Sequence, residues 1–143
     1  MKSPVWKRPV WLRVAAVFGA LFGLMTIREG GAVLFVDGAA RVAAGDYVPF
    51  VLWFNFLAGF AYVVAGVGLW FRQYWGARLA IAIAAATLLV FAAFGLHVVS
   101  GGAYETRTVV AMTLRSTIWI VIATIGWRAI SRDLTPQPLE SKP

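Results

Sequence analysis

Long apolar runs separated by short polar stretches dominate this sequence. Four runs cover residues 10–27, 49–71, 77–99 and 106–130. The shortest has 18 residues and extends about 27 Å as a helix, enough to cross the hydrocarbon core of a bilayer. The pattern predicts an all-α polytopic membrane protein: a four-helix transmembrane bundle in one domain over 1–134, followed by a disordered cytoplasmic tail over 135–143.

Composition supports a membrane protein, because the chain is 61% hydrophobic and only 13% charged. A soluble domain is closer to half apolar and a quarter charged. The net charge of +7 then serves to orient the chain and to contact lipid headgroups rather than nucleic acid. The sequence has no cysteine, which excludes disulfides, thiolate nucleophiles and iron–sulfur clusters.

The first run, with its basic start, also fits a signal peptide. Arg28 and Glu29 follow the run directly, where cleavage needs small residues, so we predict a retained helix.

Small residues recur every four positions in this run, at Ala15, Gly19 and Gly23. Such a stripe allows close approach of another helix, although tolerance of glycine in membrane helices explains it equally well.

Residues 28–48 are predicted to form a loop on the membrane surface, folded over the bundle and interrupted by glycines such as Gly30. Asp37 is expected to cap a short interfacial helix over 39–44. Pro49 is expected in the first turn of the second membrane helix.

The second membrane helix carries a stripe of polar and small residues. Asn55, Gly59, Tyr62 and Gly66 share one helical face, which predicts contact with protein rather than lipid. An asparagine in a membrane helix usually bonds to a neighbouring helix, and contact with a ligand is the alternative.

The distribution of basic residues predicts the orientation. Nine of the 13 lysines and arginines lie on the side of the two termini, and four lie on the other side. Positively charged residues favour the cytoplasmic side. We therefore expect a multi-pass protein of the bacterial inner (cytoplasmic) membrane with both termini in the cytoplasm.

One histidine, one glutamate and two arginines fall within residues 97–115, around the corner between the last two runs. The predicted ligand-binding candidates, which include two polar residues beneath this corner, are His97, Glu105, Arg107, Arg115, Glu29, Asn55 and Tyr62. We expect Arg115 about 9 Å inside the last helix, where it is costly unless paired or able to reach the surface. We favour Glu29 over Glu105 as the partner of Arg115. Two alternatives stay open: the Arg115 side chain reaches the outer surface, or it contacts an anion or substrate.

His97 is the only histidine. A monomer with a single histidine cannot ligate haem through two histidines. A copper site formed by His97, Met112 and a carboxylate would have fewer soft ligands than copper sites usually have. We therefore predict no metal, and disfavour haem and copper. Three roles remain open for His97: a hydrogen bond to a quinone, proton transfer, and an ordinary interfacial position.

Thr106 is expected to cap the last helix, with Glu105 near its positive end.

The sequence contains no phosphate-binding loop, dinucleotide fingerprint or hydrolase motif. Three hypotheses follow. The first is a non-catalytic accessory or packing module, as a homo-oligomer or within a larger membrane complex. The second is a redox helper that binds a quinone or another small ligand at the extracytoplasmic end of the bundle. The third is a small oligomeric transporter.

The stretch PFVLWFNFLAGFAYVVAGVGLWFRQYWGARLAIAIAAATLLVFAAFGLH resembles the second and third helices of DoxX-like bacterial membrane proteins. It shares a glycine-rich helix, a short basic turn and an alanine-rich helix that ends in histidine. The resemblance covers about a third of the chain and implies a small four-helix fold. It also implies a link to quinone-coupled or oxidative-stress chemistry, and assigns no catalytic residue.

Overall fold

The computed structural model describes residues 10–132, and this part of the chain is helical without strands. The helices are α1 (Val10–Phe35), α2 (Ala39–Ala44), α3 (Pro49–Trp70), α4 (Tyr74–Val99) and α5 (Thr106–Ser131). All but α2 are long and apolar enough to cross a membrane. The prediction of an all-helical fold with four helices long and apolar enough to cross a membrane is confirmed for residues 10–132. The predicted tail over 135–143 lies outside the described residues.

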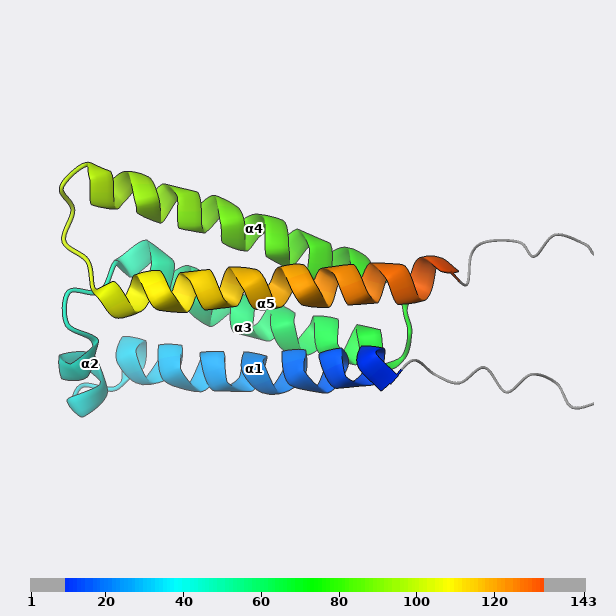
Figure 1. Cartoon of the computed structure of the whole chain (residues 1–143). Helices are drawn as coiled ribbons and strands as arrows, with labels where there is room; N and C mark the ends of the chain where they lie inside the picture. The colour runs from blue at the N-terminus through cyan, green and yellow to red at the C-terminus, as the bar shows by residue number, and fades with distance from the viewer. Residues whose placement is uncertain (1–9, 133–143) are drawn as a thin grey trace, which may run out of the picture.

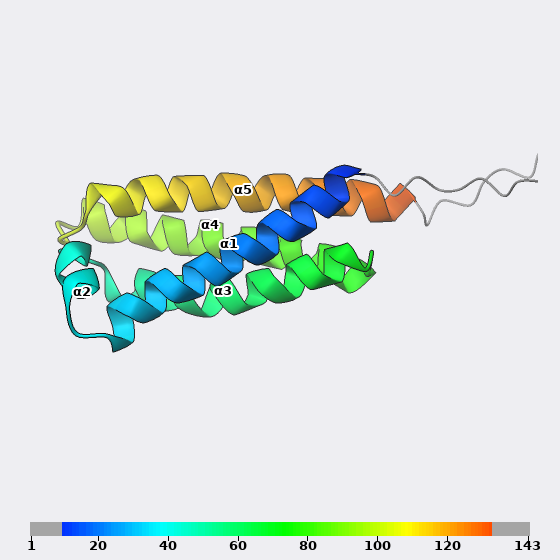
Figure 2. The same cartoon turned by 90° about the horizontal axis from the view of Figure 1, so that it is seen from below.

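The four long helices form an up-and-down bundle in which α1 contacts α3, α3 contacts α4, α4 contacts α5, and α5 contacts α1 (Figure 1). α1 begins and α5 ends at the same end of the bundle, hereafter the termini end. α2 and the α4–α5 loop lie at the opposite end, hereafter the α2 end. α1 crosses α3 obliquely and diverges from α5 toward the α2 end (Figure 2).

The first helix is longer than predicted, because it continues past residue 27 to Phe35. Gly30 is buried in it, and a Cβ at this position would lie 3.1 Å from the Cβ of Phe56. The glycine therefore provides a packing contact with α3 instead of ending the helix. The predicted surface loop shrinks to residues 36–48, and it contains the predicted short helix over 39–44.

Two predicted helix caps are wrong. The Asp37 side chain does not cap α2; it accepts a hydrogen bond from Nη1 of Arg41 at 2.5 Å. Thr106 is the first residue of α5 rather than its cap, and Glu105 precedes it without a side-chain cap bond. Pro49 does open α3 as predicted.

Small residues bring α1 and α3 into direct backbone contact. A Cβ on Gly23 would lie 2.7 Å from the Gly59 carbonyl oxygen. A Cβ on Gly66 would lie 2.7 Å from the Ala16 carbonyl oxygen. Gly23 of the predicted α1 stripe therefore meets Gly59 of the α3 stripe, whereas Gly19 lies against the Ile122 and Trp119 side chains of α5.

The α3–α4 turn is equally tight. Arg72 adopts a positive φ of 55°, and the Gln73 amide donates to the Gly68 carbonyl at 2.8 Å. A Cβ on Gly76 would lie 2.6 Å from the carbonyl carbon of Gly68. The two helices therefore leave the turn already in backbone contact.

Candidate functional site: a buried polar cluster

The predicted polar corner at the α2 end does not assemble into one site. Glu29 lies 3.7 Å from the Arg28 guanidinium, and its side chain is 75% exposed. Glu105 accepts a hydrogen bond from the Asp46 backbone amide at 3.0 Å, which joins the loop before α3 to the start of α5. Both carboxylates therefore have local partners.

His97 and Arg107 are also held apart from the interior. Nε2 of His97 lies 3.1 Å from the Ala103 carbonyl oxygen, and its ring packs edge-on against Phe50 at 6.3 Å between centroids. Arg107 is exposed. Within residues 10–132, no three histidine or acidic side chains gather closely enough to hold a metal ion.

Arg41, which the sequence analysis did not select, fastens the loop to the end of α1. Its Nε donates to the Val33 carbonyl at 3.0 Å and its Nη2 to the Leu34 carbonyl at 2.7 Å. These are carbonyls of the last helical turn, which otherwise lack intrahelical donors. With its bond to Asp37, this guanidinium is fully engaged in structure.

Arg115 differs from every other described arginine because its guanidinium lies inside the bundle. It is nine residues past the start of α5, about 13 Å along the helix. Its Cζ lies 5.7 Å from the centre of the Phe22 ring of α1. Nε and Nη1 are buried and have no hydrogen-bond partner.

The predicted ion pair between Arg115 and Glu29 is therefore wrong. Glu29 lies on the exposed side of α1 and faces Arg28, whereas α1 diverges from α5 toward the α2 end (Figure 2). Glu105 is engaged with the Asp46 amide instead. Nε and Nη1 of Arg115 are buried, although the residue as a whole is half-buried, so the alternative that the guanidinium reaches the surface through Nη2 stays open.

Tyr62 and Trp119 form the floor of the cluster. Their rings are 4.5 Å apart between centroids and are tilted by 37°, and both residues are 0% exposed. The Tyr62 hydroxyl interacts electrostatically with Arg115 and lies near Thr87, whose hydroxyl donates to the Ile83 carbonyl at 2.8 Å and keeps its capacity to accept. Neither the Tyr62 hydroxyl nor the Trp119 Nε1 meets the geometry of a hydrogen bond with another group.

Asn55 and Ser116 complete the set of buried polar groups. Asn55 Oδ1 on α3 and Ser116 Oγ on α5 are buried without partners. The sequence analysis selected Arg115, Asn55 and Tyr62 but missed Ser116 and Trp119. Trp119 follows Arg115 by four residues and so shares its helical face; that spacing could have identified it.

The chemistry of the cluster is dominated by donors. Arg115 Nε and Nη1, the Tyr62 and Ser116 hydroxyls and the Trp119 indole can all donate. Buried polar groups are nearly always hydrogen-bonded, and a buried charge is costly without a partner. The described residues place no carboxylate against Arg115. The cluster is therefore suited to a group with acceptor oxygens and negative charge.

Aromatic rings connect this cluster to the lipid-facing surface. The Phe22 ring stacks on Tyr62 at 5.9 Å and on Phe18 at 6.1 Å. Phe18 is 49% exposed and faces the outside of the bundle. The three rings therefore form one continuous stack from the outside of the bundle to Tyr62.

Models of known protein families, curated proteins and solved structures give no significant match to this chain. The resemblance to DoxX-like proteins stays a prediction.

Proposed function

We propose that this chain is a small ligand-binding protein of the bacterial inner membrane, with both termini in the cytoplasm. The orientation is supported by the nine basic residues on the termini side against four on the other side. The ligand-binding role is supported by the buried polar cluster around Arg115. With this orientation, the cluster extends from the middle of the bilayer toward its extracytoplasmic half.

The ligand we propose is an apolar molecule with acceptor oxygens, either a quinone or an amphiphilic carboxylate. The observation that carries this proposal is the Arg115 guanidinium, whose buried Nε and Nη1 have no acceptor. A ligand oxygen at this point receives charge-assisted hydrogen bonds. The Tyr62 and Ser116 hydroxyls are available as further donors.

The apolar part of the ligand would lie along the stacked rings of Phe22 and Phe18. Ligand pockets are typically apolar with a few polar groups that fix orientation, and this arrangement has both parts. A quinone would use its ring carbonyl as the acceptor, whereas a carboxylate would also neutralise Arg115.

The other two hypotheses remain predictions. Gly23, Gly59 and Gly66 pack between α1 and α3, and Gly19 packs against α5, so these positions of the small-residue stripes are occupied within the chain. Co-purification of other membrane subunits after mild extraction would test the accessory role. Flux into liposomes would test the transporter.

The first test is mass spectrometry and absorption spectroscopy of the full chain purified in mild detergent. We expect a bound quinone or carboxylate that is lost in Arg115→Gln and reduced in Tyr62→Phe. Arg107→Gln is the matched control, because this arginine is exposed at the α2 end. A ligand that is retained in Arg115→Gln, or a ligand-free wild-type protein that co-purifies with other membrane subunits, would contradict the proposal.

A further inference from the structure

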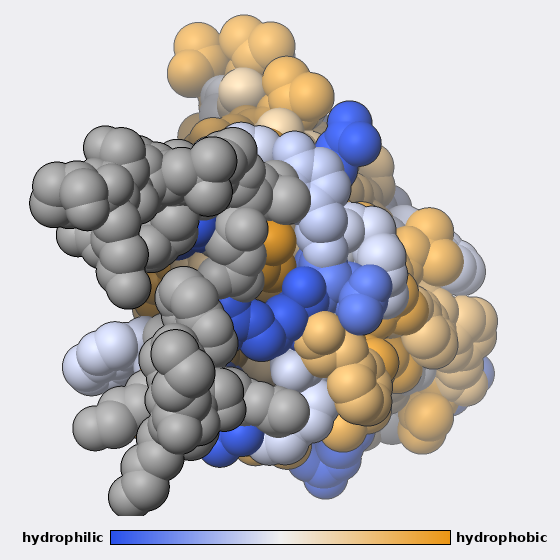
Figure 3. Space-filling view, turned by 90° about the vertical axis from the view of Figure 1, so that its right-hand side faces the viewer, coloured by the Kyte–Doolittle hydropathy of each residue, from blue (hydrophilic) through white to orange (hydrophobic). Residues whose placement is uncertain are grey.

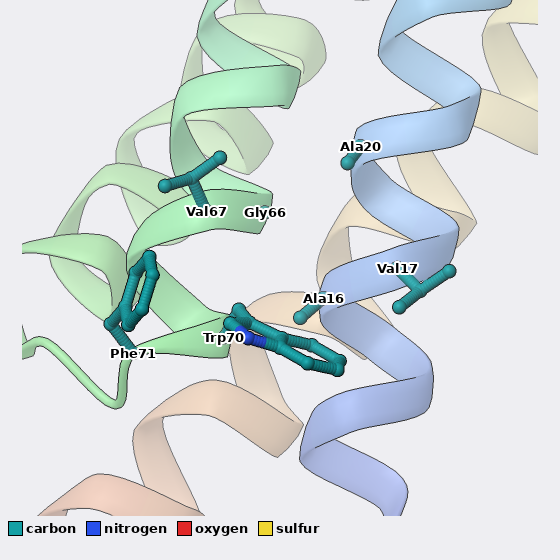
Figure 4. A pocket seen from close by; sticks show the side chains of 7 residues that line it. All are labelled: Ala16, Val17, Ala20, Gly66, Val67, Trp70 and Phe71. Atoms are coloured by element: carbon teal, nitrogen blue, oxygen red, sulfur yellow. The ribbon is translucent and has the colours of Figure 1, made fainter.

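A second feature lies between α1 and α3 in the termini half of the bundle, apart from the Arg115 cluster. It is a groove of about 160 Å³ in which every lining residue is apolar (Figure 4). An apolar cavity of about 150 Å³ is large enough to take up benzene. The groove therefore has room for a segment of a hydrocarbon chain. It is lined by Ala16, Val17, Ala20, Gly66, Val67, Trp70 and Phe71.

The groove follows from the size of the residues on each helix. Gly66 packs directly against the Ala16 backbone, so the floor is shallow and made of small residues. Val67, Trp70 and Phe71 are exposed on the outside of α3 and form the wall (Figure 4). Because these helices cross the membrane, the groove faces the acyl chains of surrounding lipid.

A cation stands at the termini end of this groove. The Arg13 Cζ lies 5.8 Å from the centre of the Trp70 ring, so Trp70 both lines the groove and supports the guanidinium. Arg13 precedes Ala16 by one turn of α1 and is exposed. No acidic side chain pairs with it among residues 10–132. Its hydrogen-bond donors are thus available to an anion beside the groove.

The wider charge pattern is complementary to an anionic headgroup. Figure 3 looks onto the termini end, where hydrophilic residues gather between hydrophobic flanks. Among residues 10–132 this end carries arginines and no acid, whereas all four acidic residues lie toward the α2 end. The arginines at the termini end are Arg13, Arg72, Arg78, Arg128 and Arg132.

We propose that the groove binds one acyl chain of an anionic phospholipid, whose phosphate pairs with Arg13. The apolar groove binds the acyl chain, and the Arg13 guanidinium next to it favours a lipid with a negatively charged headgroup. A cation close to an anionic membrane surface is worth about 1 kcal/mol, equivalent to about a fivefold preference. This inference does not depend on the ligand at Arg115.

Native mass spectrometry of the delipidated full chain, with phosphatidylglycerol and phosphatidylcholine of identical acyl chains, tests this proposal. We expect the wild type to prefer phosphatidylglycerol by about fivefold. Arg13→Gln should remove this preference, and Arg13→Lys should restore most of it. Val17→Trp should fill the groove and reduce the binding of both lipids.

The controls separate a site from a diffuse basic surface. Arg78 also lies over an aromatic ring, with its Cζ 5.7 Å from the centre of Tyr74, but does not line the groove. Val14 is 52% exposed and lies outside the groove lining. Arg78→Gln and Val14→Trp should therefore leave binding unchanged, and thermal unfolding would establish that each variant is folded.

Equal affinity for the two lipids would overturn the proposal. So would an Arg78→Gln effect as large as that of Arg13→Gln, which would indicate a diffuse basic surface. Unchanged lipid binding in a folded Val17→Trp variant would place the lipid elsewhere. A lipid-free dimer abolished by Val17→Trp would assign the groove to a second copy of this chain.

Discussion

The polar residues at the α2 end and those inside the bundle differ in whether their polar atoms have hydrogen-bond partners. At the α2 end, Glu105, His97 and Arg41 are exposed or half-buried, yet each contacts a backbone partner. In the interior, Tyr62 is fully buried and Arg115 is half-buried, and the Tyr62 hydroxyl and Nε and Nη1 of Arg115 have no hydrogen-bond partner. The polar groups at the α2 end therefore stabilise the fold, whereas those of the interior cluster have unused hydrogen-bonding capacity.

The largest effect is expected from Trp119→Ala, which removes the largest fully buried side chain. Loss of the ring that packs on Tyr62 should reduce the free energy of unfolding by about 3–5 kcal/mol. Reversible unfolding in detergent measures it. Trp11→Ala is the control, because Trp11 is 72% exposed and should change stability by less than about 0.5 kcal/mol. Equal effects of the two substitutions would show that the interior is not the packed core described here.

The next effect concerns the α1–α3 contact. Gly23→Ala places a Cβ 2.7 Å from the Gly59 carbonyl oxygen and should destabilise the protein by about 1–3 kcal/mol. Gly95→Ala is the matched control with the opposite sign. A Cβ at Gly95 meets nothing within 4 Å, and alanine favours a helix over glycine by about 0.5–1 kcal/mol. If Gly23→Ala proves neutral, the two helices are not in backbone contact.

A third prediction concerns the sign of the change at Arg115. In ligand-stripped protein, Arg115→Met should raise the free energy of unfolding by about 1–3 kcal/mol, because it removes a charged group whose buried Nε and Nη1 have no hydrogen-bond partner. The exposed Arg107, changed to methionine, should shift stability by less than about 0.5 kcal/mol. The same denaturation assay compares both variants. Marked destabilisation by Arg115→Met would indicate that this guanidinium has a structural partner.

The smallest effect is expected in the loop region. Glu105→Gln preserves the side-chain oxygen that accepts from the Asp46 amide and should be nearly neutral. Glu105→Ala removes that acceptor and should cost about 0.5–1.5 kcal/mol. Hydrogen exchange at the Asp46 amide should accelerate only in the alanine variant. Equal protection in both variants would show that the bond does not form in solution.

The number of membrane helices could be predicted because the length and composition of apolar runs determine them. The end of α1 could not be predicted, because Gly30 is a helix breaker by its sequence signal, and only the structure shows that it packs against Phe56. Arg115 was conspicuous as a charge within an apolar run. The environment of Arg115 could not be predicted, because the divergence of α1 from α5 (Figure 2) leaves no signal in the residue pattern. Trp119 resembles any other apolar residue of a membrane helix.

The tight α3–α4 turn has a consequence for the order in which the bundle assembles. Closing a short connection costs less chain entropy than joining distant segments, and contacts between nearby segments form faster. We therefore expect α3 and α4 to associate early, already joined at Gly68 and Gly76. The contact between α1 and α5 links the two most distant helices in the chain and should close last. Arg115 packs on Phe22 across that contact, so its guanidinium would be enclosed only in the last step of assembly.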